Sequence, residues 1–138
     1  MIFLDTNLAS EPVRPSPNPK IVKWLDDRDA ELAISTVVLA EIAYGIMRIP
    51  SEQRAMRLRR FPETLAAHYA GRVFAFDESS AFIYGGIAGA AARKGRTVAM
   101  ADGMIAAIAL RHSSAIATRN TRDFEGLGVD LINPWSDP

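Results

Sequence analysis

The sequence predicts an α/β fold, with a central parallel sheet of four to five strands and helices on both of its faces. Short apolar runs alternate with helical stretches along the chain, which is typical of parallel strands joined by right-handed helical crossovers. The chain has 138 residues, 49% of them hydrophobic and 23% charged, which is enough for one sizeable core. We therefore expect residues 1–138 to form a single domain.

Short apolar runs predict the strands. The run Ile2-Phe3-Leu4 precedes the turn formers Asp5-Thr6-Asn7, a pattern that indicates a fully buried strand. Residues 5–19 contain four prolines and are expected to form a loop after this strand. The other expected strands are residues 32–35, 73–76 and 115–117, with 131–132 as a short fifth strand.

Apolar residues at helical spacing predict the helices between these strands. Pro19 suits a first helical turn, whereas Pro50 ends a helix. Asp77 is a capping residue, and Gly95 is placed to stop the helix that follows it. The expected helices are residues 20–27, 36–49, 51–69 with a break at Pro62, 79–92 and 100–112.

Three glycines lie inside the expected helix 79–92, at Gly85, Gly86 and Gly89. No strand ends directly before them and no Lys-Ser or Lys-Thr pair follows, so a phosphate-binding loop is excluded. They predict close packing of this helix against a neighbour.

Composition excludes several kinds of site. Sixteen basic and sixteen acidic residues cancel, so a globally basic surface cannot attract a polyanion. There are no cysteines, which excludes disulfides, thiolate zinc sites, iron–sulfur clusters and cysteine nucleophiles. The longest uncharged segment, residues 79–92, is shorter than a membrane-spanning helix. We expect a cytoplasmic protein without a membrane anchor.

Four acidic residues interrupt or directly follow apolar sequence: Asp5, Glu41, Asp102 and Asp123. A lone carboxylate in a dry interior costs several kcal/mol, so such residues usually have a cationic partner. Each acid also has a purely structural interpretation. Asp5 could cap a helix, Asp102 could stabilise a first helical turn, and Asp123 could belong to a turn. Glu41 could lie on an exposed helical stripe.

Convergence of the four acids would create an all-oxygen pocket of high negative charge. Such a pocket suits Mg²⁺ or Mn²⁺, which prefer carboxylate and water ligands. A metal ion bound there would activate water and neutralise charge on a phosphodiester, so the chemistry indicated is phosphodiester hydrolysis.

Four segments carrying these acids resemble, in order, the motifs of PIN-domain ribonucleases, and the resemblance covers essentially the whole chain. The closing Asn133-Pro134-Trp135 resembles the VapC and FitB branch of bacterial toxin–antitoxin toxins. The four segments are Leu4-Asp5-Thr6-Asn7, Ser35-Thr36-Val37-Val38-Leu39-Ala40-Glu41-Ile42, Ala101-Asp102-Gly103-Met104-Ile105-Ala106-Ala107 and Ala117-Thr118-Arg119-Asn120-Thr121-Arg122-Asp123-Phe124.

The resemblance implies a PIN-like sandwich and a metal-dependent endoribonuclease toxin. Its metal ligands would be Asp5, Glu41 and Asp102, with Thr6 and Thr118 as hydroxyl groups of the pocket. Relatives place a fourth acid at either of two positions, so here Asp123 would be the carboxylate and Asn120 a neutral ligand or water anchor. The implied partners are RNA, a second copy of the chain, and an antitoxin with a DNA-binding N-terminus.

Two other functions fit parts of the sequence. A response-regulator receiver would use Asp77 and Thr118, but such a domain also needs an adjacent acidic pair after the first strand and a lysine after the final strand, and this sequence has neither at those places. A catalytically inactive PIN-like binding module would be expected to have lost some of the acids.

The segment 46–60 carries two further signals. Its arginines could bind RNA phosphates or form a solvated helix face. Its apolar residues could form an exposed patch for a partner. The arginines are Arg48, Arg54, Arg57, Arg59 and Arg60. The apolar residues are Ile46, Met47, Ile49, Met56 and Leu58.

Overall fold

The structure is a computed structural model that describes residues 1–136. Its parallel sheet has the strand order β3-β2-β1-β4-β5. The chain builds outward from β1 through β2 to β3, and then returns to add β4 on the other side of β1. The strand order therefore reverses between β1 and β4, and ligands bind at such reversals in open α/β sheets. The strands are β1 (Ile2–Leu4), β2 (Leu32–Ser35), β3 (Val73–Phe74), β4 (Ala115–Ala117) and β5 (Leu131–Ile132).

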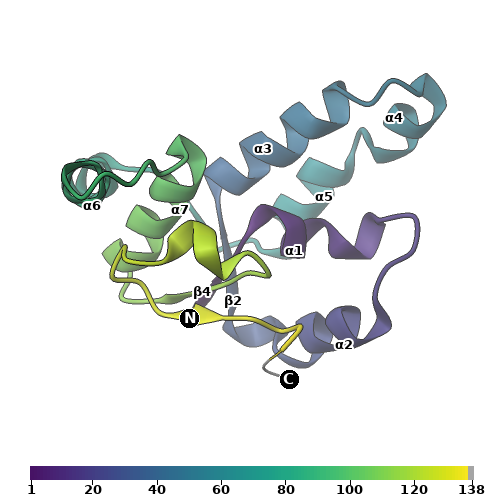
Figure 1. Ribbon diagram of the computed structural model, residues 1–138. Coiled ribbons are helices and arrows are strands. Elements are labelled where there is room, and N and C mark those ends of the chain that lie inside the picture. Colours follow the sequence, from purple (N-terminus) through teal and green to yellow (C-terminus); the bar gives the residue numbers. More distant parts are fainter. Residues whose placement is uncertain (137–138) are drawn as a thin grey trace.

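Helices connect the strands and cover the sheet (Figure 1). The α-helices are α1 (Thr6–Ser10), α2 (Pro19–Asp27), α3 (Thr36–Met47), α4 (Glu52–Leu58), α5 (Phe61–His68), α6 (Glu78–Arg93) and α7 (Met100–Arg111). Three short 3-10 helices are η1 (Glu11–Val13), η2 (Asp29–Glu31) and η3 (Thr121–Phe124). None of these helices, within residues 1–136, is long and apolar enough to cross a membrane.

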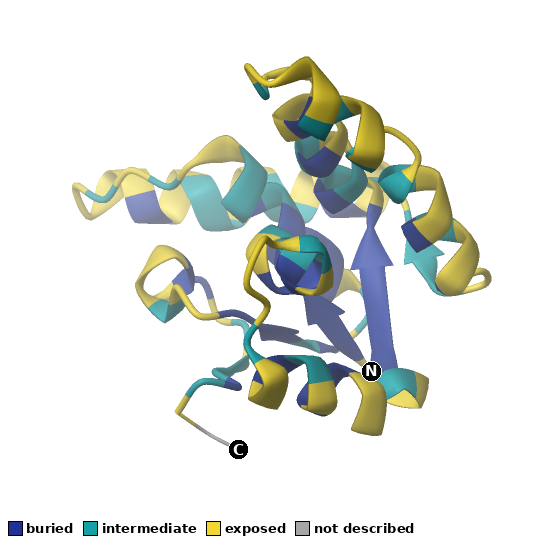
Figure 2. Ribbon diagram, turned by 90° about the vertical axis from the view of Figure 1, so that its right-hand side faces the viewer, coloured by how far each residue is buried: buried dark blue, intermediate teal, exposed yellow. Residues whose placement is uncertain are grey.

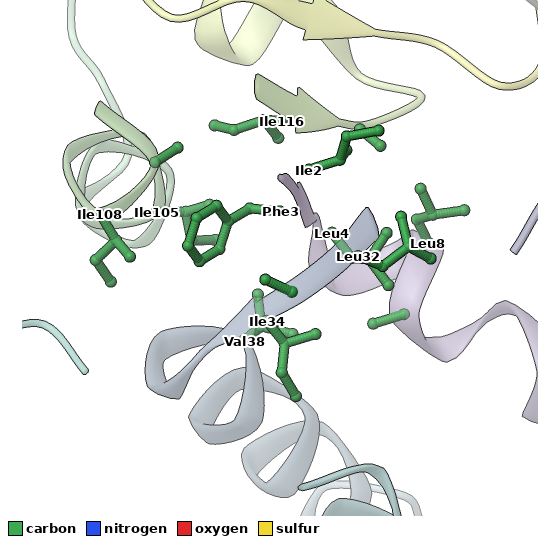
Figure 3. Close-up of a cluster of buried hydrophobic side chains, with 14 of the residues drawn as sticks. Ile2, Phe3, Leu4, Leu8, Leu32, Ile34, Val38, Ile105, Ile108 and Ile116 are labelled. Carbon is green, nitrogen blue, oxygen red and sulfur yellow. The ribbon is translucent and has the colours of Figure 1, made fainter. Parts of the chain in front are cut away.

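The core lies on both faces of the central strands. Phe3 of β1 points toward Ile105 and Ile108 of α7, whereas Leu4 lies beside Leu8 of α1 (Figure 3). Burial on both faces explains why β1 is a continuous apolar run rather than an alternating one. Figure 2 shows buried strands in the middle of the molecule and exposed residues on the outer faces of the helices. The predicted fold class is confirmed.

The expected loop at residues 5–19 contains two helical segments instead, α1 and η1. Five residues are too few for a stable isolated helix, so α1 depends on tertiary packing. Its Leu8 and Ala9 are buried, and the side chain of Asp5 caps its first turn. The turn formers after β1 therefore start a helix, which local sequence alone does not indicate.

Two prolines mark helix boundaries differently from expectation. Pro62 does not break a helix but lies in the first turn of α5, where its missing N–H costs nothing. The break falls just before it, at Arg59 and Arg60. Helix α3 ends at Met47, ahead of the segment that leads to Pro50.

The close helix contact predicted from three glycines occurs at another glycine. A Cβ atom at Gly85, Gly86 or Gly89 would meet no atom within 4 Å. At Gly103 of α7, by contrast, a Cβ atom would lie 2.7 Å from Cε1 of Tyr84 in α6. Gly103 is therefore the residue that lets these two helices approach.

The predicted apolar patch in the segment 46–60 is only partly present. Ile46 is buried, while Ile49 and Leu58 are partly buried against the core. Only Met47 and Met56 are well exposed, at 84% and 64% of their surface.

Candidate active site

Asp5 lies directly after β1, where the strand order reverses, and only 7% of its surface is exposed. Its backbone N–H continues the pairing of β1 with β4 by donating to the carbonyl of Ala117 at 3.0 Å. Its carboxylate is held on both sides: Oδ1 accepts from the backbone N–H of Thr6 and Oδ2 accepts from Oγ1 of Thr118, both at 2.7 Å. Asp5 is thus both the cap of α1 and a fixed carboxylate at the edge of the sheet.

Thr118 follows β4 and is fully buried. Its Oγ1 accepts a hydrogen bond from the backbone N–H of Asn120 at 3.0 Å and donates its own hydrogen to Asp5. The hydroxyl group therefore connects the loop after β4 to the carboxylate after β1. Asn120 contributes to this network through its backbone N–H and is otherwise exposed.

Glu41 lies in the second turn of α3 and is half-buried. Its Oε1 accepts a hydrogen bond from Oγ1 of Thr6, so Thr6 contacts Asp5 through its backbone and Glu41 through its side chain. The exposed stripe begins one turn later, where the Arg48 guanidinium lies 5.4 Å from the centre of the exposed Tyr44 ring. The carboxylate of Glu41 faces the site rather than this stripe.

Asp102 lies in the first turn of α7 and is half-buried. Its pKa is raised to about 6, mainly by burial and then by the negative charges of Asp5, Asp123 and Glu41, in that order. The pKa of Asp5 is also raised, mainly by burial, although the hydrogen bonds from Thr118 and Thr6 oppose this effect. The four predicted acids thus act on one another electrostatically, and we call them the acidic cluster.

Asp123 is exposed and lies in η3. Arg96, which the sequence analysis did not identify, holds this segment in place. Arg96, just ahead of α7, donates from Nη2 to the carbonyl of Arg122 at 2.7 Å. A Cβ atom at Gly126, which has φ +77°, would lie 3.0 Å from Nη1 of Arg96. Since the partner of Arg96 is a backbone carbonyl, no sequence motif could reveal this contact.

The donor chemistry of the acidic cluster fits a hard divalent cation, since it offers carboxylate and hydroxyl oxygens. Its charge fits too, because none of the four acids makes an ion pair within the described chain. The side chains do not form a closed cage as they stand: across residues 1–136, no group of three Asp, Glu or His side chains is placed to hold a metal ion. Asp5 and Glu41 are instead bound to hydroxyl groups.

The receiver alternative is not supported by the position of Asp77. Its side chain caps α6 by accepting from the backbone N–H of Ser80 at 2.8 Å. Hydrogen bonding to Ser80 lowers the pKa of Asp77, and the nearby Arg111 also lowers it. Asp77 is therefore a stabilised capping residue, as Asp and Ser at this point of the sequence predict.

Comparison with known proteins gives consistent results over nearly the whole chain. Residues 2–129 match the family model of the PIN domain. Toxin FitB of Neisseria gonorrhoeae is 40% identical over 139 residues, which cover 99% of this chain and 100% of FitB. VapC ribonuclease Y4jK of Sinorhizobium fredii is 36% identical over 137 residues, which cover 98% of each chain.

The same similarity extends to solved structures. A chain in the structure of FitAB bound to an IR36 DNA fragment matches with a TM-score of 0.89 and 39% sequence identity. The match covers 100% of this chain and 98% of that chain. This chain therefore shares the fold of that protein over its whole length.

Proposed function

Because this chain belongs to the PIN-domain family, with FitB and a VapC ribonuclease among its relatives, we propose that it is a metal-dependent endoribonuclease, the toxin of a toxin–antitoxin pair. We treat residues 1–138 as one PIN domain. The observation that carries the proposal is the acidic cluster. Four carboxylates act on one another at the strand-order reversal, and none has a cationic partner in the described chain.

Asp5, Glu41, Asp102 and Asp123 are the proposed ligands of Mg²⁺ or Mn²⁺, with Asn120 as a neutral ligand or water anchor. When bound, the ion lowers the pKa of a coordinated water and neutralises charge on the scissile phosphate. Attack by water oxygen on phosphorus forms one P–O bond and breaks the bond to the 3′ oxygen. The products are a 5′-phosphate and a 3′-hydroxyl.

The chain's own contribution is orientation of the carboxylates. Thr118 fixes one oxygen of Asp5, and the backbone N–H of Thr6 fixes the other. The Thr6 hydroxyl holds Glu41. Asp5 and Glu41 therefore keep a preferred direction before substrate arrives, which reduces the reorganisation that the reaction needs.

The proposed partners follow from the same relatives. FitB is named a toxin, and its structural counterpart is part of the FitAB complex on DNA. We therefore include an antitoxin among the partners. The family resemblance further implies that this antitoxin has a DNA-binding N-terminus and that the toxin is a homodimer acting on RNA in the cytoplasm. An antitoxin could inhibit the enzyme by placing an arginine or lysine against the acidic cluster, because a charge-assisted pair there would compete with the metal ion.

The test is cleavage of total RNA by the purified chain with Mg²⁺, with Mn²⁺ and with EDTA, followed by analysis of the product ends. We expect cleavage only with a divalent ion, and 5′-phosphate ends. Cyclic phosphate ends, or equal cleavage in EDTA, would reject the mechanism. A chain that cleaves no RNA but still binds an antitoxin would support the inactive binding module instead.

A further inference from the structure

A small cavity of about 200 Å³ opens beside Glu41, between α1, α3, α4 and α5. The same elements lie on one side of the sheet in Figure 1. We call this cavity the Glu41 pocket, and the residues that matter to its chemistry are Thr6, Glu41, Gly45, Ile46, Arg54 and Phe61. Two of them, Thr6 and Glu41, also belong to the hydrogen-bonded site described above, so the pocket adjoins the acidic cluster.

The pocket combines an apolar wall with basic groups. Ile46 and Phe61 supply apolar surface, while Arg14 and Arg54 supply the positive charge. Arg14 is paired with the buried Glu11 at 3.1 Å, but Arg54 makes no ion pair in the described part of the chain. Arg54 is therefore available for an anionic ligand.

The basic surface continues beyond the pocket. A second hollow shares Val13 and Arg54 with the Glu41 pocket and adds Arg57 and Leu58. Positive charge thus extends from the region of Glu41 along α4, although the chain as a whole has no net charge. This local arrangement complements a polyanion that passes through the site.

Gly45 lines the Glu41 pocket. It lies in the middle of α3, four residues after Glu41 and therefore on the same helix face. A Cβ atom there would meet nothing within 4 Å, so no packing contact requires glycine. Glycine inside a helix is less stable than alanine, and its backbone here needs no left-handed conformation. Glycine at this position leaves the pocket beside the Glu41 carboxylate unfilled.

We propose that the Glu41 pocket binds one unstacked base of an RNA strand next to the scissile phosphate, with Arg54 and then Arg57 contacting the flanking phosphates. The inference rests on the proposed ribonuclease function and adds a subsite to it. Proteins that bind single-stranded RNA commonly insert splayed bases against apolar or aromatic side chains and bind the backbone with basic residues. The unpaired Arg54 favours a nucleotide over an apolar peptide as the occupant.

The experiment measures binding of a short fluorescein-labelled single-stranded RNA of mixed sequence to the full chain in EDTA, where cleavage is absent. Gly45→Phe should weaken binding on the order of tenfold by filling the pocket. Arg54→Ala should weaken binding and reduce its salt dependence by about one released counterion. The matched control is Gly86→Phe, since Gly86 is also a mid-helix glycine with open space around it, and this variant should bind like the wild type.

A second readout maps the cleavage positions with Mg²⁺ by primer extension, where Gly45→Phe should change the preferred positions and Gly86→Phe should not. If Gly45→Phe fails to fold, Gly45→Leu and Arg54→Ala provide the same comparison. Wild-type RNA affinity and cleavage positions in these variants would overturn the proposal. If Gly45→Phe kept wild-type RNA affinity but no longer bound a co-expressed antitoxin, the pocket would be a protein-binding site instead. A wild-type chain that binds RNA in EDTA but cleaves none with metal would reject the proposed function alone, and one that binds no single-stranded RNA would reject the subsite.

Discussion

Two clusters of charged groups in this molecule are built in opposite ways. In the acidic cluster, four carboxylates lie near one another without a cation. In the second, which we call the Asp29 cluster, Asp29 contacts Nε2 of His68 at 2.6 Å and Nη2 of Arg72 at 3.5 Å. Arg72 also donates from Nη1 to the backbone carbonyls of Asp29 and Leu32, at 2.5 and 2.6 Å. The Asp29 cluster thereby ties η2 and β2 to the end of α5.

The two clusters shift carboxylate pKa values in opposite directions. The hydrogen bond from His68 lowers the pKa of Asp29, and Arg72 lowers it further. Burial and like charge raise the pKa of Asp102. A carboxylate with a lowered pKa stabilises the folded state, whereas one with a raised pKa opposes folding when ionised. The comparison indicates that the Asp29 cluster stabilises the fold, and it supports the proposal that the acidic cluster binds a ligand.

The largest expected effect is on activity, from Asp102→Asn. Loss of a partner outside the ligand shell of a metal site already costs 10–100-fold, so loss of a proposed ligand should reduce RNA cleavage by about 100-fold or more. Stability near neutral pH should not fall, because the substitution removes like-charge repulsion. The measurements are initial cleavage rates with Mg²⁺ and urea unfolding of both proteins.

The matched substitution in the other cluster is Asp29→Asn, which should leave cleavage unchanged and lower the urea midpoint. If Asp102→Asn unfolded the protein while Asp29→Asn did not, the functional assignment of the two clusters would be reversed.

Thr118→Val should affect both stability and cleavage. The change keeps the shape of the side chain but removes the donor to Asp5 and the acceptor for Asn120. We expect a loss of about 1–3 kcal/mol in the free energy of unfolding, because the buried carboxylate loses a partner. Cleavage should fall by about 10–100-fold, as for other residues that orient metal ligands. Thr118→Ser retains the hydroxyl and should restore most of both properties; equal losses in the two variants would contradict the role of the hydrogen bond.

The strands could be predicted from the sequence, and the four acids selected as candidates, because both depend on local pattern. Each strand is an apolar run, and each acid stands out against apolar neighbours, as Asp5 does directly after β1. The same local reasoning failed at α1, whose five residues are helical only because Leu8 and Ala9 are buried by the rest of the fold. It also failed for the helix contact, because Gly103 is recognised only through Tyr84 of another helix.

The candidate site could be proposed from the sequence as a set of residues, but its geometry could not. Spacing cannot show that Thr6 joins Asp5 to Glu41, or that Thr118 donates to Asp5 from 113 residues away. Nor can it show that the carboxylates are bound to hydroxyl groups instead of forming a closed cage. These features depend on the strand order, which places β1 beside β4.

Arg72→Ala should lower stability without changing cleavage. The guanidinium donates to two backbone carbonyls and lies 5.0 Å from the centre of the Tyr69 ring. Leaving one carbonyl without a partner should cost about 1–3 kcal/mol in urea unfolding. Arg72→Lys should lose less, since it keeps one donor but not the planar fork. A parallel loss of cleavage in Arg72→Ala, measured where the variant is fully folded, would argue that the two clusters are coupled.

The smallest expected effect is a difference in how the clusters respond to pH in EDTA. The folded-state pKa of Asp102, about 6, lies above its ordinary value of 3.8. Its contribution to stability is therefore fully present below about pH 4 and is lost as the pH rises through 6. For Asp29 the folded-state pKa lies below 3.8, so its contribution is present above about pH 4 and is lost as the pH falls toward that lower value.

Unfolding free energies of the wild type, Asp102→Asn and Asp29→Asn, measured between about pH 3 and 8, distinguish these two opposite pH dependences of stability. Relative to Asp102→Asn, the wild type should lose stability between about pH 4 and 7. Relative to Asp29→Asn, its advantage should shrink as the pH falls below about 4. Added Mg²⁺ should remove the first dependence, because a bound cation stabilises the ionised acids, and should leave the second unchanged. Identical pH profiles for both pairs would contradict the distinction between a paired and an uncompensated cluster.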